Sequence, residues 1–173
     1  MDWYGTVFEV IDMRSFSNLW FWIMLAVVWS STSHWVLGVP YDMVGRARRT
    51  GGQAARDLED LVRINTNRLL FIADESGLWV VGIGSAFLSG AGILGFFYWV
   101  ELAQAVFLLA LPLTFVAFLS VHSARRIQAG ENEGEALWRR LRTHRTVTQL
   151  IGVVSIFVTA LWGMYMNLAV MLL

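Results

Sequence analysis

Cysteine and lysine are both absent from this chain of 173 residues. Without cysteine there is no disulfide framework, no thiolate metal site and no cysteine-ligated iron–sulfur cluster. Charged residues are also scarce, at 15% of the sequence. Hydrophobic residues make up 57%, above the roughly 45–50% of ordinary soluble domains, and the mean hydropathy is +0.57. This composition indicates an integral membrane protein.

Motifs that carry chemistry are missing as well. The sequence contains no P-loop, no HExxH and no pattern typical of a Ser-His-Asp or Cys-His nucleophile. The acidic residues of the first connecting segment lack the ligand density of a metal site and are interpreted as partners of nearby arginines. We therefore expect no catalytic activity and no cofactor. The expected partners are membrane lipids and other membrane subunits, not nucleic acid or a small-molecule substrate.

Four apolar runs are long enough to cross a bilayer, which takes about 20 helical residues. They cover residues 18–38, 77–99, 102–122 and 148–173. Only Val100 and Glu101 separate the second run from the third, which predicts a tight helical hairpin. The sequence thus predicts an all-α fold, an integral membrane four-helix bundle that forms a single domain over residues 1–173.

The arginines predict the topology of this bundle. They are concentrated in two connections, residues 39–76 and 123–147, and only Arg14 lies elsewhere. The positive-inside rule places both connections in the cytoplasm and both termini in the periplasm of a bacterial inner membrane. Acidic residues stand in residues 1–17 where a signal peptide has a positive start, so we expect this segment to be retained as a periplasmic interfacial segment.

Both connections are predicted to be helical. An apolar stripe at helical spacing runs through the first one: Leu58, Leu61, Val62, Leu69 and Ile72. Such a helix lies on the membrane, packs on a neighbouring helix or docks a partner protein. We expect it to end at Asp74–Gly77. In the second connection acidic residues precede the arginines, an order that the helix dipole favours, and we expect this helix to continue into the last span.

The arginines of these connections are candidate contacts for anionic lipid head groups. The residues in question are Arg46, Arg48, Arg49, Arg125, Arg126, Arg139 and Arg140. The alternative interpretation is that they are solvated and only orient the protein in the membrane.

Three of the four runs carry small or polar residues at about four-residue spacing, which is typical of helix–helix contacts in lipid. The three stripes are Ala26, Ser30, His34 and Gly38; Gly82, Ser85, Ala86 and Gly90; and Ser155, Thr159, Gly163 and Asn167. Because His34 lies at the same predicted depth as Ser85 and Ser155, we expect it to form a hydrogen bond with one of them. Trp20, Trp29 and Trp35 are expected to face outward.

His34 and His122 also allow a different interpretation, as the two axial ligands of a b-type haem between helices. Axial ligands lie nearly level, whereas these two histidines are predicted to differ in depth by about 6 Å. Packing is therefore the favoured role for His34.

The stretch Phe8–Val44 resembles small inner-membrane proteins of purple-type bacteria that are labelled as components of the Suf iron–sulfur assembly complex. The resemblance continues through "RINTNRLLFIADE" at Arg63–Glu75. It implies an association with iron–sulfur cluster biogenesis. No catalytic motif accompanies it, so it implies no role for any single residue.

Together these observations predict a non-catalytic accessory, assembly or stabilising subunit of a larger inner-membrane complex. A respiratory or photosynthetic host complex is an expectation from the resemblance. The alternatives are a membrane tether for iron–sulfur assembly, the haem protein described above and a small transporter. A transporter usually carries charged groups within its spans, and no Asp, Glu or Arg lies clearly within a predicted span.

Overall fold

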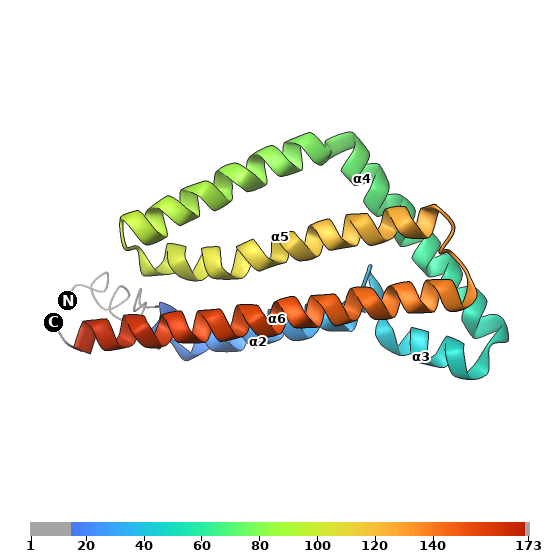
Figure 1. Cartoon of the computed structure of the whole chain (residues 1–173), viewed down its shortest axis with the longest axis horizontal. Coiled ribbons are helices and arrows are strands. Elements are labelled where there is room, and N and C mark those ends of the chain that lie inside the picture. The colour runs from blue at the N-terminus through green and yellow to red at the C-terminus, as the bar shows by residue number, and fades with distance from the viewer. Residues whose placement is uncertain (1–14, 172–173) are drawn as a thin grey trace, which may run out of the picture.

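The computed structural model describes residues 15–171 and is almost entirely helical (Figure 1). Its elements in chain order are η1 (Ser15–Ser17), α2 (Leu19–His34), β1 (Trp35–Val36), β2 (Val39–Pro40), α3 (Tyr41–Thr50), α4 (Gly52–Gly92), η2 (Ile93–Phe97, a π-helical turn), α5 (Glu101–Gln128) and α6 (Gly134–Met171). Of the interfacial segment predicted for residues 1–17, only Ser15–Ser17 lies within the described residues.

The first predicted span is shorter than expected. The side chain of Asn18 caps α2 by accepting a hydrogen bond from the amide of Trp20 at 2.9 Å. The helix ends at His34, not at Gly38, because the chain turns into a two-stranded antiparallel hairpin. Leu37 and Gly38 both have positive φ at the turn, as a tight hairpin requires. Asn65 of α4 donates to the carbonyl of Gly38 at 3.0 Å and anchors the turn.

The break predicted at Asp74–Gly77 is absent, because α4 runs as one helix from Gly52 to Gly92. None of these residues is proline, so nothing removes a backbone hydrogen bond there. In Figure 1 the first part of α4 crosses one end of the bundle, and after a bend the second part returns beside α5. The continuous last helix is confirmed, since α6 begins at Gly134 and runs through residues 148–171 of the predicted fourth span.

Three helical segments of the described chain are long and apolar enough to cross a membrane. They are α4 continued by η2, then α5 and then α6. The 16 residues of α2 extend over about 24 Å at 1.5 Å per residue, less than the roughly 30 Å of a bilayer core. That α2 is a fourth membrane span therefore stays a prediction.

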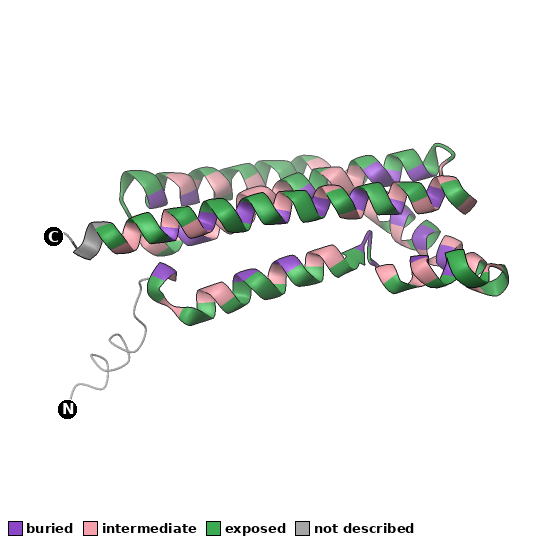
Figure 2. Cartoon of the chain, turned by 60° about the horizontal axis from the view of Figure 1, so that its bottom comes forward, coloured by how far each residue is buried: buried purple, intermediate pink, exposed green. Residues whose placement is uncertain are grey.

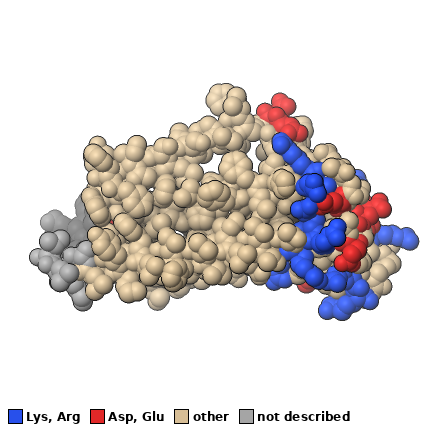
Figure 3. All heavy atoms as spheres, viewed as in Figure 1, with Lys and Arg blue, Asp and Glu red and all other residues tan. Residues whose placement is uncertain are grey.

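Among the described residues, nearly all charged side chains lie at one end of the molecule (Figure 3). Within residues 15–171 every Asp, Glu and Arg lies in residues 42–75 or 125–145, except Glu101. We call this the arginine-rich end. The remainder is an apolar bundle of α2, the second part of α4, α5 and α6.

Two clusters of buried apolar residues can be distinguished, and buried positions occur along the whole bundle (Figure 2). The larger one lies at the arginine-rich end and joins the hairpin, α3, α4, α5 and α6. It comprises Val36, Leu37, Val39, Val44, Ala47, Leu58, Val62, Ile127, Leu137 and Leu141. The smaller one lies in the apolar bundle and comprises Leu25, Trp29 and Val116. The amphipathic part of α4 thus packs on neighbouring helices through Leu58 and Val62, while Ile72 of the predicted stripe is exposed.

Candidate functional site

The small-residue stripe of α6 is buried against η1 and α2. Its members are Ser155, Thr159 and Gly163, which are buried, and Asn167, which is half-buried. A Cβ at Gly163 would lie 3.2 Å from ring atoms of both Phe16 and Trp22. Gly152, which the sequence analysis did not include, approaches more closely still, because a Cβ there would lie 2.7 Å from Cε3 of Trp29. Glycines in α6 therefore admit aromatic rings of η1 and α2 onto the helix backbone.

The stripe predicted in the first span faces outward, so that prediction is wrong. Its members Ala26, Ser30, His34 and Gly38 are all exposed. The face that packs contains Leu25 and Trp29, one position earlier in the helix, and Trp29 is buried although it was expected to face outward. The cause is the contact between Trp29 and Gly152: a ring against a glycine replaces the expected contact between small residues.

The predicted hydrogen bond of His34 is also absent. His34 is the last residue of α2, and it is exposed and meets the neighbouring Trp35 edge to face at a centroid distance of 6.0 Å. Ser155 Oγ is buried without a hydrogen-bond partner among the described residues, and Ser85 is exposed. The rotation of α2 about its axis explains this, because it turns the Ala26–His34 face away from α6.

The haem hypothesis named His34 and His122, and both imidazoles are exposed. The buried histidine is His144, in the arginine-rich part of α6, with Nδ1 3.1 Å from Ser123 Oγ of α5. Burial lowers the pKa of His144 from 6.5 to about 4. A spacing signal for His144 was present in the sequence, since residues 144, 148 and 152 continue the stripe of residues 155, 159 and 163 at the same helical spacing.

The stripe predicted in the second span lies on an open face. Gly82, Ser85 and Ala86 are exposed and Gly90 is half-buried. A Cβ at Gly82 or Gly90 would find no atom within 4 Å, and the same holds at Gly77 and Gly84. We call the side of α4 that carries Gly82, Ala86 and Gly90 the glycine-rich face; Gly77 and Gly84 lie on the opposite side of the helix. Nothing in the described chain fills the space that its missing side chains leave.

Large apolar side chains border the glycine-rich face. Leu78 is 87% exposed and Trp79 is 74% exposed, and Ile83 and Phe87 are exposed as well. Figure 2 shows this part of α4 as mostly exposed. A helix with this composition is suited to contact lipid or another membrane helix, and its small residues permit the closest approach.

The far end of the hairpin between α4 and α5 is held by one buried amide. Gln104 is fully buried, donates to the carbonyl of Gly95 at 2.8 Å and accepts from Nε1 of Trp162 at 3.0 Å. Gly95 is required here, because a Cβ would lie 2.9 Å from the backbone nitrogen of Gln104. The sequence analysis missed this network, which fastens the tip of the hairpin to α6 and leaves the glycine-rich face unsupported between its ends.

The arginines predicted to contact lipid divide into two groups. Arg46, Arg48, Arg49 and Arg139 are exposed and form no ion pair with another described residue. Arg126 and Arg140 both bind Glu131, and Arg125 lies 3.6 Å from Asp74. The hydrogen bond from Arg140, with further help from Arg126, lowers the pKa of Glu131 to about 2. The first group remains available to anionic head groups.

The chain matches no protein-family model, no curated protein and no solved structure in the comparisons. The resemblance to Suf-associated membrane proteins therefore stays a prediction.

Proposed function

We propose that this chain is a non-catalytic accessory or assembly subunit of a larger bacterial inner-membrane complex. It docks a transmembrane helix of that complex on the glycine-rich face of α4. The observation that carries this proposal is the empty space at Gly82 and Gly90, where a Cβ would meet no other atom.

The energetic argument concerns what glycine contributes to a membrane helix. Each glycine in a helix interior costs about 1 kcal/mol relative to alanine. Elsewhere in this chain that cost is offset by close contacts, as between Gly152 and Trp29. Lipid gives helices no hydrophobic drive to associate, so close backbone packing is the main compensation that a partner helix would provide.

The surroundings of the face favour a protein partner over lipid alone. Exposed aromatic rings flank it at Trp79 and Phe87, and more follow at Phe97, Tyr98 and Trp99. Aromatic anchors around a central contact are typical of protein interfaces. In this arrangement the arginine-rich end lies in the cytoplasm, and Arg46, Arg48 and Arg49 contact anionic lipid there.

The test is purification from native membranes in a mild detergent, followed by native electrophoresis and mass spectrometry of the retained proteins. We expect the tagged wild-type chain to migrate with other membrane subunits. The double variant Gly82→Leu/Ala86→Leu should lose them and still fold, since leucine favours the helix more than glycine does. The matched control is Val153→Leu, which adds bulk on an exposed face of α6 and should retain the partners.

Two results would contradict this proposal. One is a wild-type chain that migrates alone. The other is retention of soluble iron–sulfur assembly proteins without any membrane subunit, which would favour the tether that the resemblance implies.

A further inference from the structure

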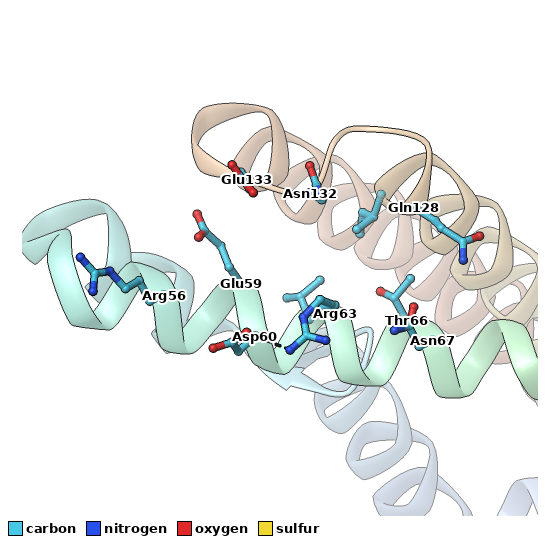
Figure 4. A pocket seen from close by; sticks show the side chains of 11 residues that line it. Arg56, Glu59, Asp60, Arg63, Thr66, Asn67, Gln128, Asn132 and Glu133 are labelled. Atoms are coloured by element: carbon cyan, nitrogen blue, oxygen red, sulfur yellow. Dashed lines mark hydrogen bonds and ion pairs between the residues drawn. The ribbon is translucent and has the colours of Figure 1, made fainter.

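A polar cavity of about 400 Å³ opens at the arginine-rich end, away from the glycine-rich face. One wall is α4, and the other is formed by the end of α5 and the connection to α6 (Figure 4). Its buried apolar base contains Val62 and Ile127, which belong to the larger core cluster. This base makes the cavity part of the folded core, and its size is that of a small-molecule site.

The charges around this cavity are unequal. Three carboxylates line it (Glu59, Asp60 and Glu133), against two guanidinium groups (Arg56 and Arg63). Asp60 pairs with Arg63 at 3.1 Å. Glu59 of α4 accepts a hydrogen bond from the amide of Gly134 at 3.0 Å, which ties its carboxylate to the start of α6 on the other wall. Among residues 15–171, no ion pair involves Glu133 or Arg56.

The acidic and the donor groups lie at different places along the cavity. In Figure 4, Glu59 and Glu133 point toward one another across the opening, and Thr66 and Asn67 lie further along α4, with Arg63 between the two groups. Two facing carboxylates repel each other unless a cation lies between them. An arginine and an amide offer several N–H donors for a carboxylate.

We propose that this cavity binds a small zwitterion of the amino-acid type. Its ammonium group lies between Glu59 and Glu133, and its carboxylate accepts hydrogen bonds from Arg63 and Asn67. Binding of a metal ion is not favoured, because the described residues contain no cluster of three or more His, Cys, Asp or Glu side chains that would hold one.

The test is binding to the full-length protein in detergent, measured by calorimetry with each of the twenty standard L-amino acids. Methylamine and acetate serve as probes that carry only one of the two charges. We expect saturable binding of at least one amino acid, and at least tenfold weaker binding of methylamine and acetate. Binding of either single-charge probe as tightly as the best amino acid would overturn the proposal, as would the absence of saturable binding for all twenty.

Variants locate the binding to this cavity. Glu133→Gln and Arg63→Gln change exposed side chains, so the fold should persist, and each should weaken binding at least tenfold. The controls Glu135→Gln and Arg142→Gln change exposed residues outside the cavity and should bind as the wild type does. Equal effects of cavity and control variants would refute the site.

Discussion

The two ends of this molecule are held together in different ways. At the arginine-rich end, ten buried apolar residues from five segments form a continuous core. In the apolar bundle the buried apolar cluster has only three residues, and further contacts include ring-on-glycine fits, edge-to-face aromatic pairs and the Gln104 network. Water drives apolar burial at the first end, whereas lipid gives no such drive at the second. Packing in the bundle is therefore local, and each contact depends on shape.

The largest expected difference concerns two leucines of the same helix. Leu141 is fully buried in the arginine-rich end, and Leu150 is 60% exposed in the apolar part of α6. Leu141→Ala should lower the free energy of unfolding by about 2–5 kcal/mol, since it leaves a cavity in a packed core. Leu150→Ala should change it by less than about 0.5 kcal/mol. Denaturant titration in detergent, followed by tryptophan fluorescence, measures both, and equal losses would contradict the contrast between the two ends.

A second expected difference concerns the pH dependence of stability, which should depend on buried His144 and not on exposed His122. The unfolded imidazole takes up a proton as the pH falls below 6.5, whereas buried His144 does so only near its pKa of about 4. The folded state is therefore fully stabilised above pH 6.5 and loses stability as the pH falls toward 4. The gap between the two pKa values corresponds to about 3 kcal/mol. The unfolding free energies should be measured between pH 6.5 and 4.5. The lowered pKa of Glu131 changes stability mainly below that range, so its titration does not obscure that of His144.

The variant His144→Gln isolates this effect. It keeps a neutral hydrogen-bonding group beside Ser123, so the pH dependence of stability should flatten between pH 6.5 and 4.5. His122→Gln changes an exposed imidazole and should leave the slope of the wild type. A slope that His144→Gln does not alter would show that another group titrates.

The same contrast explains what the sequence predicted well. The apolar runs within α4, α5 and α6, the segregation of arginine in the sequence and the continuity of α6 follow from composition and charge order, and these do not depend on how helices rotate. At the arginine-rich end an alternation of apolar and polar residues also identified Leu58 and Val62 as packing positions, since water makes one helix face differ from the other.

Composition and charge order could not predict how α2 is rotated about its axis, and so which of its faces packs on α6. Residues 19–29 of α2 are all apolar, so periodicity does not tell the inward Leu25 from the outward Ala26. The stripe rule sought small residues on both helices, whereas the structure pairs Gly152 with an indole ring. The hairpin at residues 35–40 was missed because its strands have two residues each and because Leu37 adopts a positive φ that leucine rarely takes. The cavity at Thr66 depends on segments far apart in the chain.

The smallest expected effect is the difference in unfolding free energy between two variants in which one glycine is replaced by alanine. At Gly152 the new Cβ would lie 2.7 Å from the Trp29 ring, so the ring or the helix must move. Overpacking of this kind costs about 1–3 kcal/mol. At Gly84 the new Cβ meets nothing within 4 Å, and alanine should stabilise the helix by up to about 1 kcal/mol. Gly152→Ala should thus lower and Gly84→Ala raise the unfolding free energy in detergent. Fluorescence quenching of Trp29 should change only in the first variant. If both glycines responded alike, the close contact between α2 and α6 would not be what holds the bundle together, and the distinction between a packed α6 face and an open α4 face would fail with it.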